Sequence, residues 1–417
     1  MKISRFLKNA IVQSLESFPA VYIAGSRQCG KTTLARSIAA TRSKMAYVTF
    51  DDIQMRLAAQ QDPNAFLRAF EESVVLDEVQ LVPELFRPLK MLIDENRHKS
   101  HNGRGKFLLT GSANIMSLPQ LSDALVGRMA LHTLMPFSVA ETCQSGQTNF
   151  IDDAFSKDWK LKQLPKVNLI QIMVKASFPE LFALKQHALQ YKWCNGYINT
   201  LMQRDIRALM EVEKIAMLPN LLRLLAARTS GLLNEAGLAR DASLNHLTIK
   251  RYRLLLESLF LTLSIPAWSS NLGKRLIKAS KVYISDLNIL AYLLNINLQD
   301  LPQINPMLFG QVLENFVAIE LTKQLTYSDI HARLYHYRTA SGQEVDFILE
   351  GIQNHIVGIE VKARSQVSPK DFQHLETLKQ EIGEKFRRGF VFYSGTDIVP
   401  FGENMWAIPF SALWLSV

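Results

Sequence analysis

A short segment near the N-terminus, Gly25–Thr32, constrains the fold of this chain more strongly than any other. It reads Gly-Ser-Arg-Gln-Cys-Gly-Lys-Thr, follows the apolar run Ala20–Ala24 and precedes the helix-like run Thr33–Ile38. A glycine-rich loop between a strand and a helix presents backbone N–H groups and a helix N-terminus to an anion. The segment therefore predicts a phosphate-binding P-loop; the alternative is a glycine-rich turn that matches by chance.

The side chains of this loop indicate which phosphates it would bind. Two glycines let the backbone close around a triphosphate such as ATP. Lys31 is expected to reach the β and γ phosphates, and the Thr32 hydroxyl is expected to ligate Mg²⁺. The predicted nucleotide contacts of the loop are Gly25, Ser26, Arg27, Gln28, Cys29, Gly30, Lys31, Thr32 and Thr33. Cys29 is interpreted as a small loop residue rather than a redox thiol, because nothing pairs with it as a resolving thiol.

A second motif, Ser73–Glu78, is a short apolar run that ends in two adjacent carboxylates. Asp77 is expected to hold Mg²⁺, directly or through water, as a Walker B residue does. Glu78 would then orient or deprotonate the attacking water, which requires a carboxylate beside the metal rather than on it. The pair predicts ATP hydrolysis and not only ATP binding; the alternative is an exposed acidic strand end.

Two further polar groups follow in the same region. The apolar strand Lys106–Leu109 ends in Thr110–Asn114, at the strand edge where ligands bind in α/β sheets. Ser112 or Thr110 is expected to sense the γ-phosphate, or else the segment is an ordinary strand-terminating turn. If subunits form a ring, Arg128 is the candidate for a finger that reaches the neighbour's nucleotide; the alternative is a surface or C-cap arginine.

Composition limits the remaining possibilities. The chain has 417 residues, 48% hydrophobic and 20% charged, which predicts a folded soluble protein of two or three domains. Its formal charge of +9 favours a polyanion partner; the alternative is a moderately basic soluble protein without one. The three cysteines form no CxxC pair, so they cannot build a zinc site alone, and they fit a reducing cytosol. Without a long apolar segment, we expect a cytoplasmic protein with no membrane span.

Changes in pattern along the chain predict an α/β protein of four regions. Residues 1–140 alternate apolar strands with helical segments and read as a parallel-sheet nucleotide-binding core. Residues 141–215 read as a linker and a helical lid, 216–295 as a winged-helix-like region, and 296–417 as a further α/β core.

The third region has the order helix, turn, helix and basic ribbon. A second helix, capped by Ser243, would enter a DNA major groove, while ribbon lysines and an arginine would grip phosphates. The ribbon residues are Lys274, Arg275, Lys278 and Lys281. The alternative is a helical connector whose lysines are only solvated.

The C-terminal region contains a second group of chemically active residues. Glu314 lies in an apolar helix, Asp346 in one apparent strand, and Glu360 and Lys362 on one face of the next. Asp346 and Glu360 are expected to share Mg²⁺, with Glu314 completing the acidic cluster. Lys362 would orient or activate a water against a phosphodiester.

Taken together, these motifs resemble the prokaryotic AAA-type ATPases whose C-terminal half was long called a domain of unknown function. That half resembles a PD-(D/E)xK restriction-endonuclease-like core through Glu314, Asp346, Glu360 and Lys362, and the resemblance covers nearly the whole chain. Cys29 departs from the pattern, since a small apolar residue is more usual there. The resemblance leaves two readings of the core open: an active nuclease centre, or a scaffold held by an ion-pair network.

Two functions follow from this resemblance and the charge. In the first, the chain is a DNA-dependent ATPase that remodels or translocates on DNA, for example branched or recombination intermediates, as a homo-oligomer such as a hexamer. In the second, it is a nucleotide-controlled switch that binds a protein partner through an inactive C-terminal core. ATP turnover stimulated by DNA, with a steep salt dependence, would distinguish the first from the second.

Overall fold

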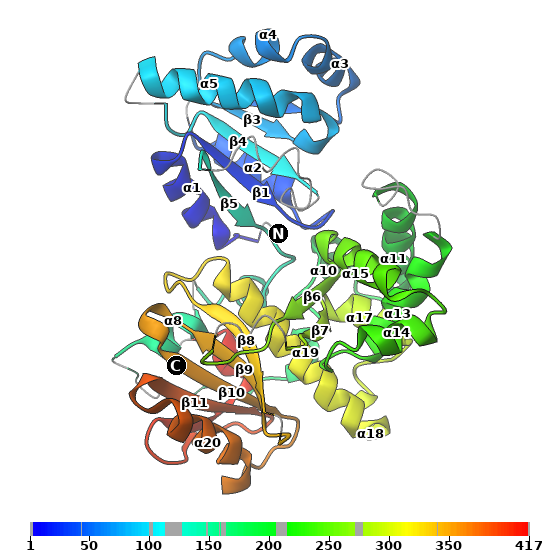
Figure 1. The fold of residues 1–417 in the computed structure, drawn as a ribbon, viewed down its shortest axis with the longest axis vertical. Coiled ribbons are helices and arrows are strands. Elements are labelled where there is room, and N and C mark those ends of the chain that lie inside the picture. The colour runs from blue at the N-terminus through cyan, green and yellow to red at the C-terminus, as the bar shows by residue number, and fades with distance from the viewer. Residues whose placement is uncertain are drawn as a thin grey trace. The chain divides into compact units, whose positions relative to one another are not determined.

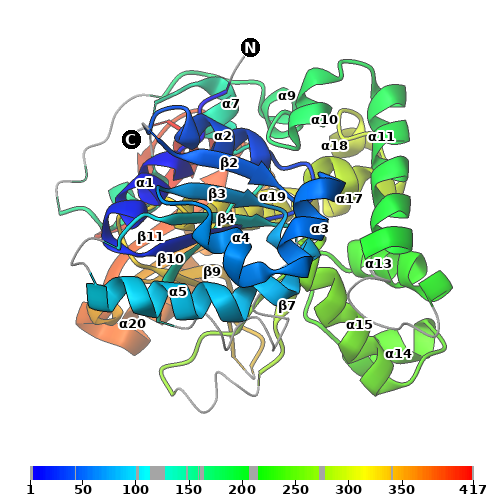
Figure 2. The same ribbon diagram turned by 90° about the horizontal axis from the view of Figure 1, so that it is seen from above.

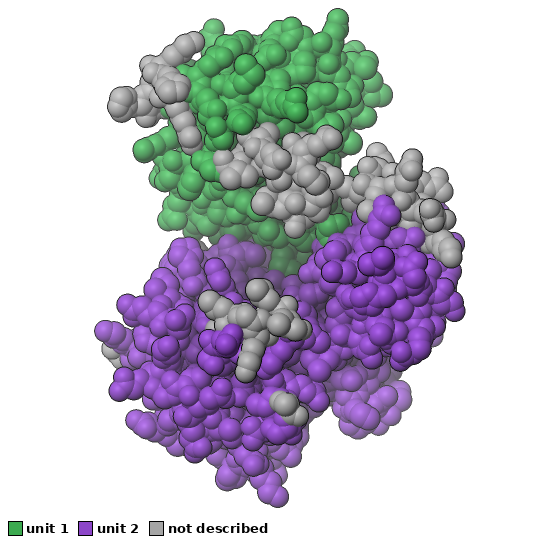
Figure 3. Space-filling view, viewed as in Figure 1, with its two compact units in different colours: residues 1–136, 258–260 green, residues 137–257, 261–417 purple. Residues whose placement is uncertain are grey.

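The chain forms two compact units, shown in separate colours in Figure 3. The first contains residues 1–136 and 258–260, and the second contains residues 137–257 and 261–417. The domain boundaries predicted from the sequence, after residues 140, 215 and 295, stay predictions. The computed structural model describes residues 3–42, 44–99, 103–112, 127–146, 149–157, 159, 164–205, 215–271, 278–339 and 341–415.

The first unit is built on a five-stranded parallel sheet with the strand order β2-β3-β4-β1-β5 (Figure 1). The strands are β1 (Ala20–Ala24), β2 (Ala46–Thr49), β3 (Val74–Asp77), β4 (Phe107–Gly111) and β5 (Met129–Thr133). Every residue of β1, β3 and β4 is buried, which explains their continuous apolar runs, because helices cover both faces of a parallel sheet. All five strands run the same way, so their carboxyl ends meet at one edge.

One helix precedes the first strand, and four others connect the strands that follow. They are α1 (Leu7–Ser17), α2 (Lys31–Ala39), α3 (Ile53–Gln61), α4 (Pro63–Arg68) and α5 (Phe86–Lys99). Helices α2 and α5 lie on opposite faces of the sheet, as Figures 1 and 2 show. Aspartates start two of the shorter helices: Asp52 accepts hydrogen bonds from the backbone N–H groups of Gln54 and Met55, and Asp62 from that of Ala65.

The second unit begins with helices and a two-stranded hairpin. The elements are α7 (Val139–Cys143), α8 (Phe150–Phe155), α9 (Leu169–Met173), α10 (Pro179–Ala183), α11 (His187–Thr200), α13 (Leu218–Ala227), α14 (Glu235–Asp241), α15 (His246–Ser258), β6 (Thr262–Ile265) and β7 (Lys281–Ile284). Strands β6 and β7 are antiparallel, and β7 also bonds to the segment before α14: Ser230 N–H donates to the Val282 carbonyl (2.9 Å). The start of α15 differs from the prediction, since Asn245 caps it by accepting from Thr248 N–H (2.7 Å), whereas Ser243 has a left-handed backbone.

The rest of the second unit is a mixed six-stranded sheet with the order β12-β13-β11-β10-β9-β8. Its elements are α17 (Leu287–Leu294), α18 (Leu301–Ile304), α19 (Pro306–Leu325), β8 (Arg333–Arg338), β9 (Glu344–Glu350), β10 (Ile356–Lys362), α20 (Gln373–Ile382), β11 (Phe386–Tyr393), β12 (Val399–Pro400) and β13 (Met405–Pro409). Strands β8, β9 and β10 are antiparallel, and β10, β11 and β13 are parallel. Helix α19 packs against β7, β8 and β10, and α20 packs against β9, β10 and β11.

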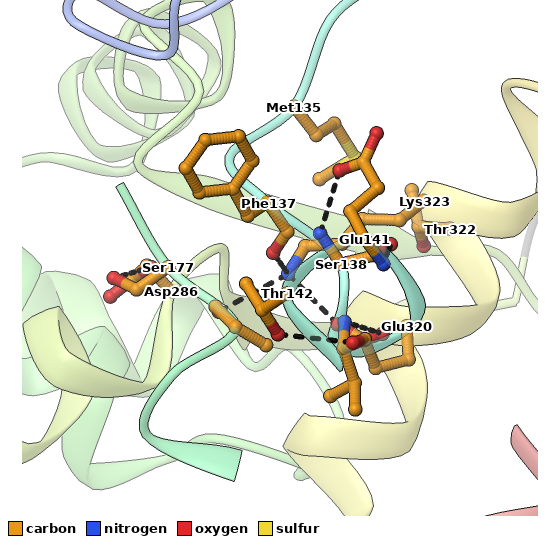
Figure 4. A network of polar contacts seen from close by, with 12 residues as sticks. Met135, Phe137, Ser138, Glu141, Thr142, Ser177, Asp286, Glu320, Thr322 and Lys323 are labelled. Atoms are coloured by element: carbon orange, nitrogen blue, oxygen red, sulfur yellow. Dashed lines mark hydrogen bonds and ion pairs between the residues drawn. The ribbon is translucent and has the colours of Figure 1, made fainter. Parts of the chain in front are cut away.

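A buried polar network fixes the first residues of the second unit to α19 (Figure 4). Lys323 Nζ donates to the carbonyls of Phe137 (2.8 Å) and Ala176 (3.3 Å) and to Glu320 Oε1 (2.8 Å). The other oxygen of Glu320 accepts the N–H of Val139 at 2.9 Å. Both charged side chains are at most 3% exposed, so their charges are satisfied by each other and by the backbone.

Among the described residues, no helix has both the length and the apolar character that a bilayer crossing requires.

Candidate functional site

The P-loop connects the end of β1 to the start of α2, as predicted. A Cβ atom on Gly25 would lie 2.2 Å from the Leu134 carbonyl oxygen, so only glycine fits there. Gly30 stands at the N-cap of α2 with a left-handed φ of 100°, which glycine adopts without strain. The N-terminus of α2 therefore faces the end of the loop, where a phosphate would be stabilised.

The side chains of the loop divide into two groups. Lys31 is 4% exposed, and its Nζ donates to the carbonyls of Gly25 (3.0 Å) and Ser26 (2.9 Å). Cys29 is fully buried, and its Sγ donates to the Leu134 carbonyl (3.2 Å), so it fills space on the side away from solvent. Gln28 is exposed, whereas Arg27 and Thr32 are half-buried and Thr33 lies in the first turn of α2.

Asp77, at the end of β3, is surrounded by hydroxyl groups. Its Oδ2 accepts from Thr32 Oγ1 (2.9 Å) and Tyr47 OH (2.7 Å), and its Oδ1 accepts from Thr110 Oγ1. Burial, together with the Asp77 carboxylate, raises the pKa of Tyr47 to about 12, so the phenol remains a donor. Thr32 and Asp77 thus lie side by side and offer the hard oxygen ligands that Mg²⁺ binds.

Glu78 is held by a residue that the sequence interpretation missed. Its backbone adopts a left-handed φ of 59°, and its N–H donates to Thr110 Oγ1 (3.2 Å). Gln80 Nε2 donates both to Glu78 Oε2 and to Ser112 Oγ, the latter at 3.0 Å. Gln80 therefore joins the predicted water-orienting carboxylate to the predicted phosphate sensor. A glutamine two residues after a carboxylate carries no sequence signal of this role.

Arg128 forms a bidentate ion pair inside its own chain. Its Nε lies 2.7 Å from Asp94 Oδ1, and its second donor lies 2.9 Å from Asp94 Oδ2. Asp94 belongs to α5, so this pair fixes the start of β5 to that helix. The role of Arg128 as a finger in a ring stays a prediction. Residues 113–126, which include the end of the predicted sensor segment Thr110–Asn114, lie outside the described residues.

The second predicted constellation is also brought together. Asp346 on β9 and Glu360 on β10 lie on neighbouring strands, and Asp346 Oδ2 accepts the Val361 N–H at 2.8 Å. Lys362 Nζ lies 2.6 Å from Glu360 Oε2. Glu314, on α19, joins the group through Lys281, which was predicted to bind DNA phosphates.

Lys281 corrects the prediction that this lysine grips DNA phosphates. Its side chain is 2% exposed, and its Nζ lies 2.9 Å from Glu314, 2.5 Å from Glu344 and 3.6 Å from Asp346. Tyr283 OH also donates to Glu314 at 2.8 Å. The lysine points inward because β7 directs alternate side chains toward α19. Of the other ribbon residues, Lys278 is exposed and donates to a backbone carbonyl, while Lys274 and Arg275 lie outside the described residues.

Burial sets the protonation of this cluster. Burial and the nearby Asp346 raise the pKa of Glu314 to about 8, and the same two causes raise the pKa of Glu360. Burial alone would lower the pKa of Lys281, but its carboxylate neighbours outweigh burial and raise it, so the ammonium stays charged. Within the described part of the chain, no three acidic, histidine or cysteine side chains are arranged to hold a metal ion.

The exposed face of α15 is basic at several positions. His246, Lys250 and Arg251 are exposed on it, together with Leu247 and Leu254. Tyr252, on the same helix, is buried, and Arg253 forms ion pairs with Glu235 and Glu257.

A P-loop after β1, a carboxylate pair after β3 and polar residues after β4, all at one edge of a parallel sheet, define an AAA-type P-loop ATPase. Residues 17–143 match the family model of the AAA domain, and the chain is an ATPase. Residues 166–300 and 309–413 match two domains of unknown function, DUF8612 and DUF4143 respectively.

The chain is also similar to individual proteins. An uncharacterized protein of Mycobacterium tuberculosis and one of Mycobacterium bovis are each 26% identical over 397 residues, 95% of this chain and 81% of the relative. A Walker-type ATPase of Pyrococcus abyssi aligns with a TM-score of 0.39 and 14% identity, over 70% of this chain and 95% of that one. AMPPCP-bound DnaA from Aquifex aeolicus aligns with a TM-score of 0.29 and 13% identity, over 60% and 86% of the two chains.

Proposed function

We propose that the chain is a cytoplasmic, Mg²⁺-dependent ATPase whose turnover is coupled to DNA, and that the second unit is the DNA-binding part. The observation that carries the DNA assignment is the exposed basic face of α15, placed after α14 as the second helix of a helix-turn-helix. A positive helix face of this kind fits a major groove, where cations contact phosphates and side chains reach base edges.

The ATPase chemistry follows from the groups at the sheet edge. Lys31 would move its ammonium from the loop carbonyls to the phosphates, whose charge is far greater. Thr32 and Asp77, 2.9 Å apart, would hold Mg²⁺, which supplies charge neutralisation of the transferring phosphoryl group. Glu78 would orient the attacking water, and Ser112 would report the γ-phosphate to Glu78 through Gln80.

Two architectural features support the DNA-binding assignment of the second unit. Helices α13, α14 and α15 followed by the β6–β7 hairpin have the order of a winged helix. The succession α19, β8, β9, β10, α20 and β11, with Asp346, Glu360 and Lys362 on neighbouring strands, supports a restriction-endonuclease-like core. Both kinds of domain commonly contact duplex backbone, although fold alone does not decide function.

The test is the ATPase rate with and without duplex, single-stranded and branched DNA, at two salt concentrations. We expect stimulation by DNA that fades as salt rises, because phosphate contacts release counterions. Lys250→Ala/Arg251→Ala should weaken DNA binding. It should also make the slope of log K for DNA binding against log salt concentration less negative by roughly 2, since each lost phosphate contact contributes about 0.9. Lys185→Ala/Lys192→Ala, which removes two exposed cations elsewhere in the same unit, is the matched control.

Two variants test the ATPase assignment itself. Lys31→Ala should weaken nucleotide binding, and Glu78→Gln should keep ATP bound but unhydrolysed. Normal hydrolysis by both would contradict the assignment of the site.

A second function is favoured by one observation. Leu247 and Leu254 are 77% and 49% exposed on the same face of α15. Apolar side chains at this spacing suit a protein partner, in which case the chain is a nucleotide-controlled switch. An ATPase rate indifferent to every DNA, with no DNA binding in either nucleotide state, would favour the switch.

A further inference from the structure

The acidic cluster of the restriction-endonuclease-like core surrounds a lysine that comes from outside that core. Glu314 belongs to α19, Glu344 and Asp346 belong to β9, and Lys281 is the first residue of β7. The Nζ atom of Lys281 lies within 4 Å of a carboxylate oxygen from each of the three. A single buried ammonium therefore lies against two of the predicted metal ligands, Glu314 and Asp346.

Lys281 is not placed to leave this position. Its backbone lies in the ladder between β6 and the segment before α14, with Ile265 opposite it on one side and Leu232 on the other. Its side chain is 2% exposed, so it cannot reach a DNA phosphate while the hairpin is formed. An ammonium anchored from both sides behaves as a fixed part of the cluster.

The remaining ligands of the cluster are also engaged. Asp346 uses its second oxygen to accept the Val361 N–H, and Glu344 also pairs with Arg338 at 2.8 Å. Glu360 has Lys362 at 2.6 Å on one oxygen. Its other oxygen, Oε1, is buried without a hydrogen-bond partner and lies 3.9 Å from His374 Nδ1, so Glu360 alone falls short of the several oxygen ligands that Mg²⁺ requires.

The residues present therefore do not fit a divalent metal beside Lys281. We propose that Lys281 takes the place of the metal as the cation of this cluster, so that the core contacts DNA without cleaving it. The DNA contact rests on the proposed function, whereas the replacement of the metal rests on the contacts of Lys281 alone. The lysine ties the β6–β7 hairpin to α19 and β9, so the winged-helix-like region and the sheet are held together by the residues a nuclease would use for its metal.

The test measures Mn²⁺ bound to the full chain without nucleotide, by electron paramagnetic resonance, and the unfolding midpoint with and without Mg²⁺. Asp346→Asn identifies which Mn²⁺ belongs to this cluster. We expect the wild type and Asp346→Asn to bind the same amount of Mn²⁺. We also expect that Mg²⁺ does not raise the unfolding midpoint of the wild type. Lys281→Met, which keeps the length of the side chain and removes its charge, should lower the midpoint and create a Mn²⁺ site that Asp346→Asn abolishes. Lys278→Met, at an exposed lysine nearby, should change neither.

Two outcomes would overturn the proposal. One is Mn²⁺ bound to the wild type and lost in Asp346→Asn, a measurement that remains decisive even where Lys281→Met fails to fold. The other is a folded Lys281→Met protein with an unchanged midpoint and no new Mn²⁺ site. Neither depends on whether DNA stimulates the ATPase, so this proposal and the proposed function fail separately.

Discussion

Replacing Lys323 by methionine should destabilise the second unit strongly. The substitution keeps most of the side-chain volume but removes an ammonium that serves Glu320 and the carbonyls of Phe137 and Ala176 (Figure 4). Breaking a buried ion pair by removing one partner typically costs about 3–5 kcal/mol, because the remaining charge is left uncompensated. Because methionine fills most of the same volume, the cost comes from the uncompensated Glu320 charge and the two carbonyls that lose their donor. We expect Lys323→Met to fall within that range, which corresponds to a fall in the unfolding midpoint of roughly 10 °C.

The assay uses a property of the sequence. All five tryptophans, at positions 159, 193, 268, 406 and 414, belong to the second unit, so tryptophan fluorescence follows its unfolding apart from the ATPase unit. The double variant Lys323→Met/Glu320→Gln removes both charges and leaves an amide oxygen to accept the Val139 N–H. It should recover most of the loss, with a coupling of about 2 kcal/mol or more between the two sites. A cost below about 1 kcal/mol for Lys323→Met, or strict additivity in the double variant, would refute the reasoning.

Three further predictions concern single contacts. Gln80→Ala should lower the rate of ATP hydrolysis roughly 10-fold or more with little change in ATP affinity, because Glu78 loses the group that positions it. Single-turnover kinetics would measure this rate, and an unchanged rate would show that Gln80 is not part of the site. If Arg128 acts on a neighbour's nucleotide, Arg128→Ala should abolish turnover and leave ATP binding intact, whereas Asp94→Ala, which breaks the same ion pair, should preserve turnover; equal losses would make the pair purely structural. His336 is 1% exposed, and burial lowers its pKa to about 4. As the pH falls below the ordinary histidine pKa of about 6.5, the unfolded chain binds the proton before the folded chain does, so the free energy of unfolding should fall by up to about 3 kcal/mol between pH 6.5 and 4. Urea titrations at successive pH values should show a smaller fall in His336→Gln.

The ATPase unit was predictable from sequence because its signals are local. A glycine-rich loop fixes where β1 ends and α2 begins, and the apolar run before Asp77 fixes a strand, so both meet at one sheet edge. The 2.9 Å contact between Thr32 and Asp77 follows from that geometry. Gln80 was missed because its role depends on the bend of the chain after Glu78, which no pattern encodes.

The second unit was less predictable because its charged residues act over long sequence separations. A lysine in a basic stretch is usually solvated, and nothing near Lys281 in sequence shows that α19 and β9 will enclose it. The positions of Asp346, Glu360 and Lys362 were predicted because strand alternation is a local rule. The position of the Lys281 ammonium beside Asp346 depends on how the β6–β7 hairpin packs against α19, which only the fold determines.

The network around Lys323 holds the first residues of the second unit, and other hydrogen bonds hold the last residues of the first. The Leu134 N–H donates to the Ala24 carbonyl beside the P-loop, and Arg5 donates to the Met135 carbonyl. The carbonyl of Phe137, two residues later, already belongs to the Lys323 network. On each side of Pro136, whose ring fixes its own φ, the chain is held by hydrogen bonds within its own unit. Within the second unit, loss of the Lys323 ammonium would therefore free the chain at Phe137 from α19.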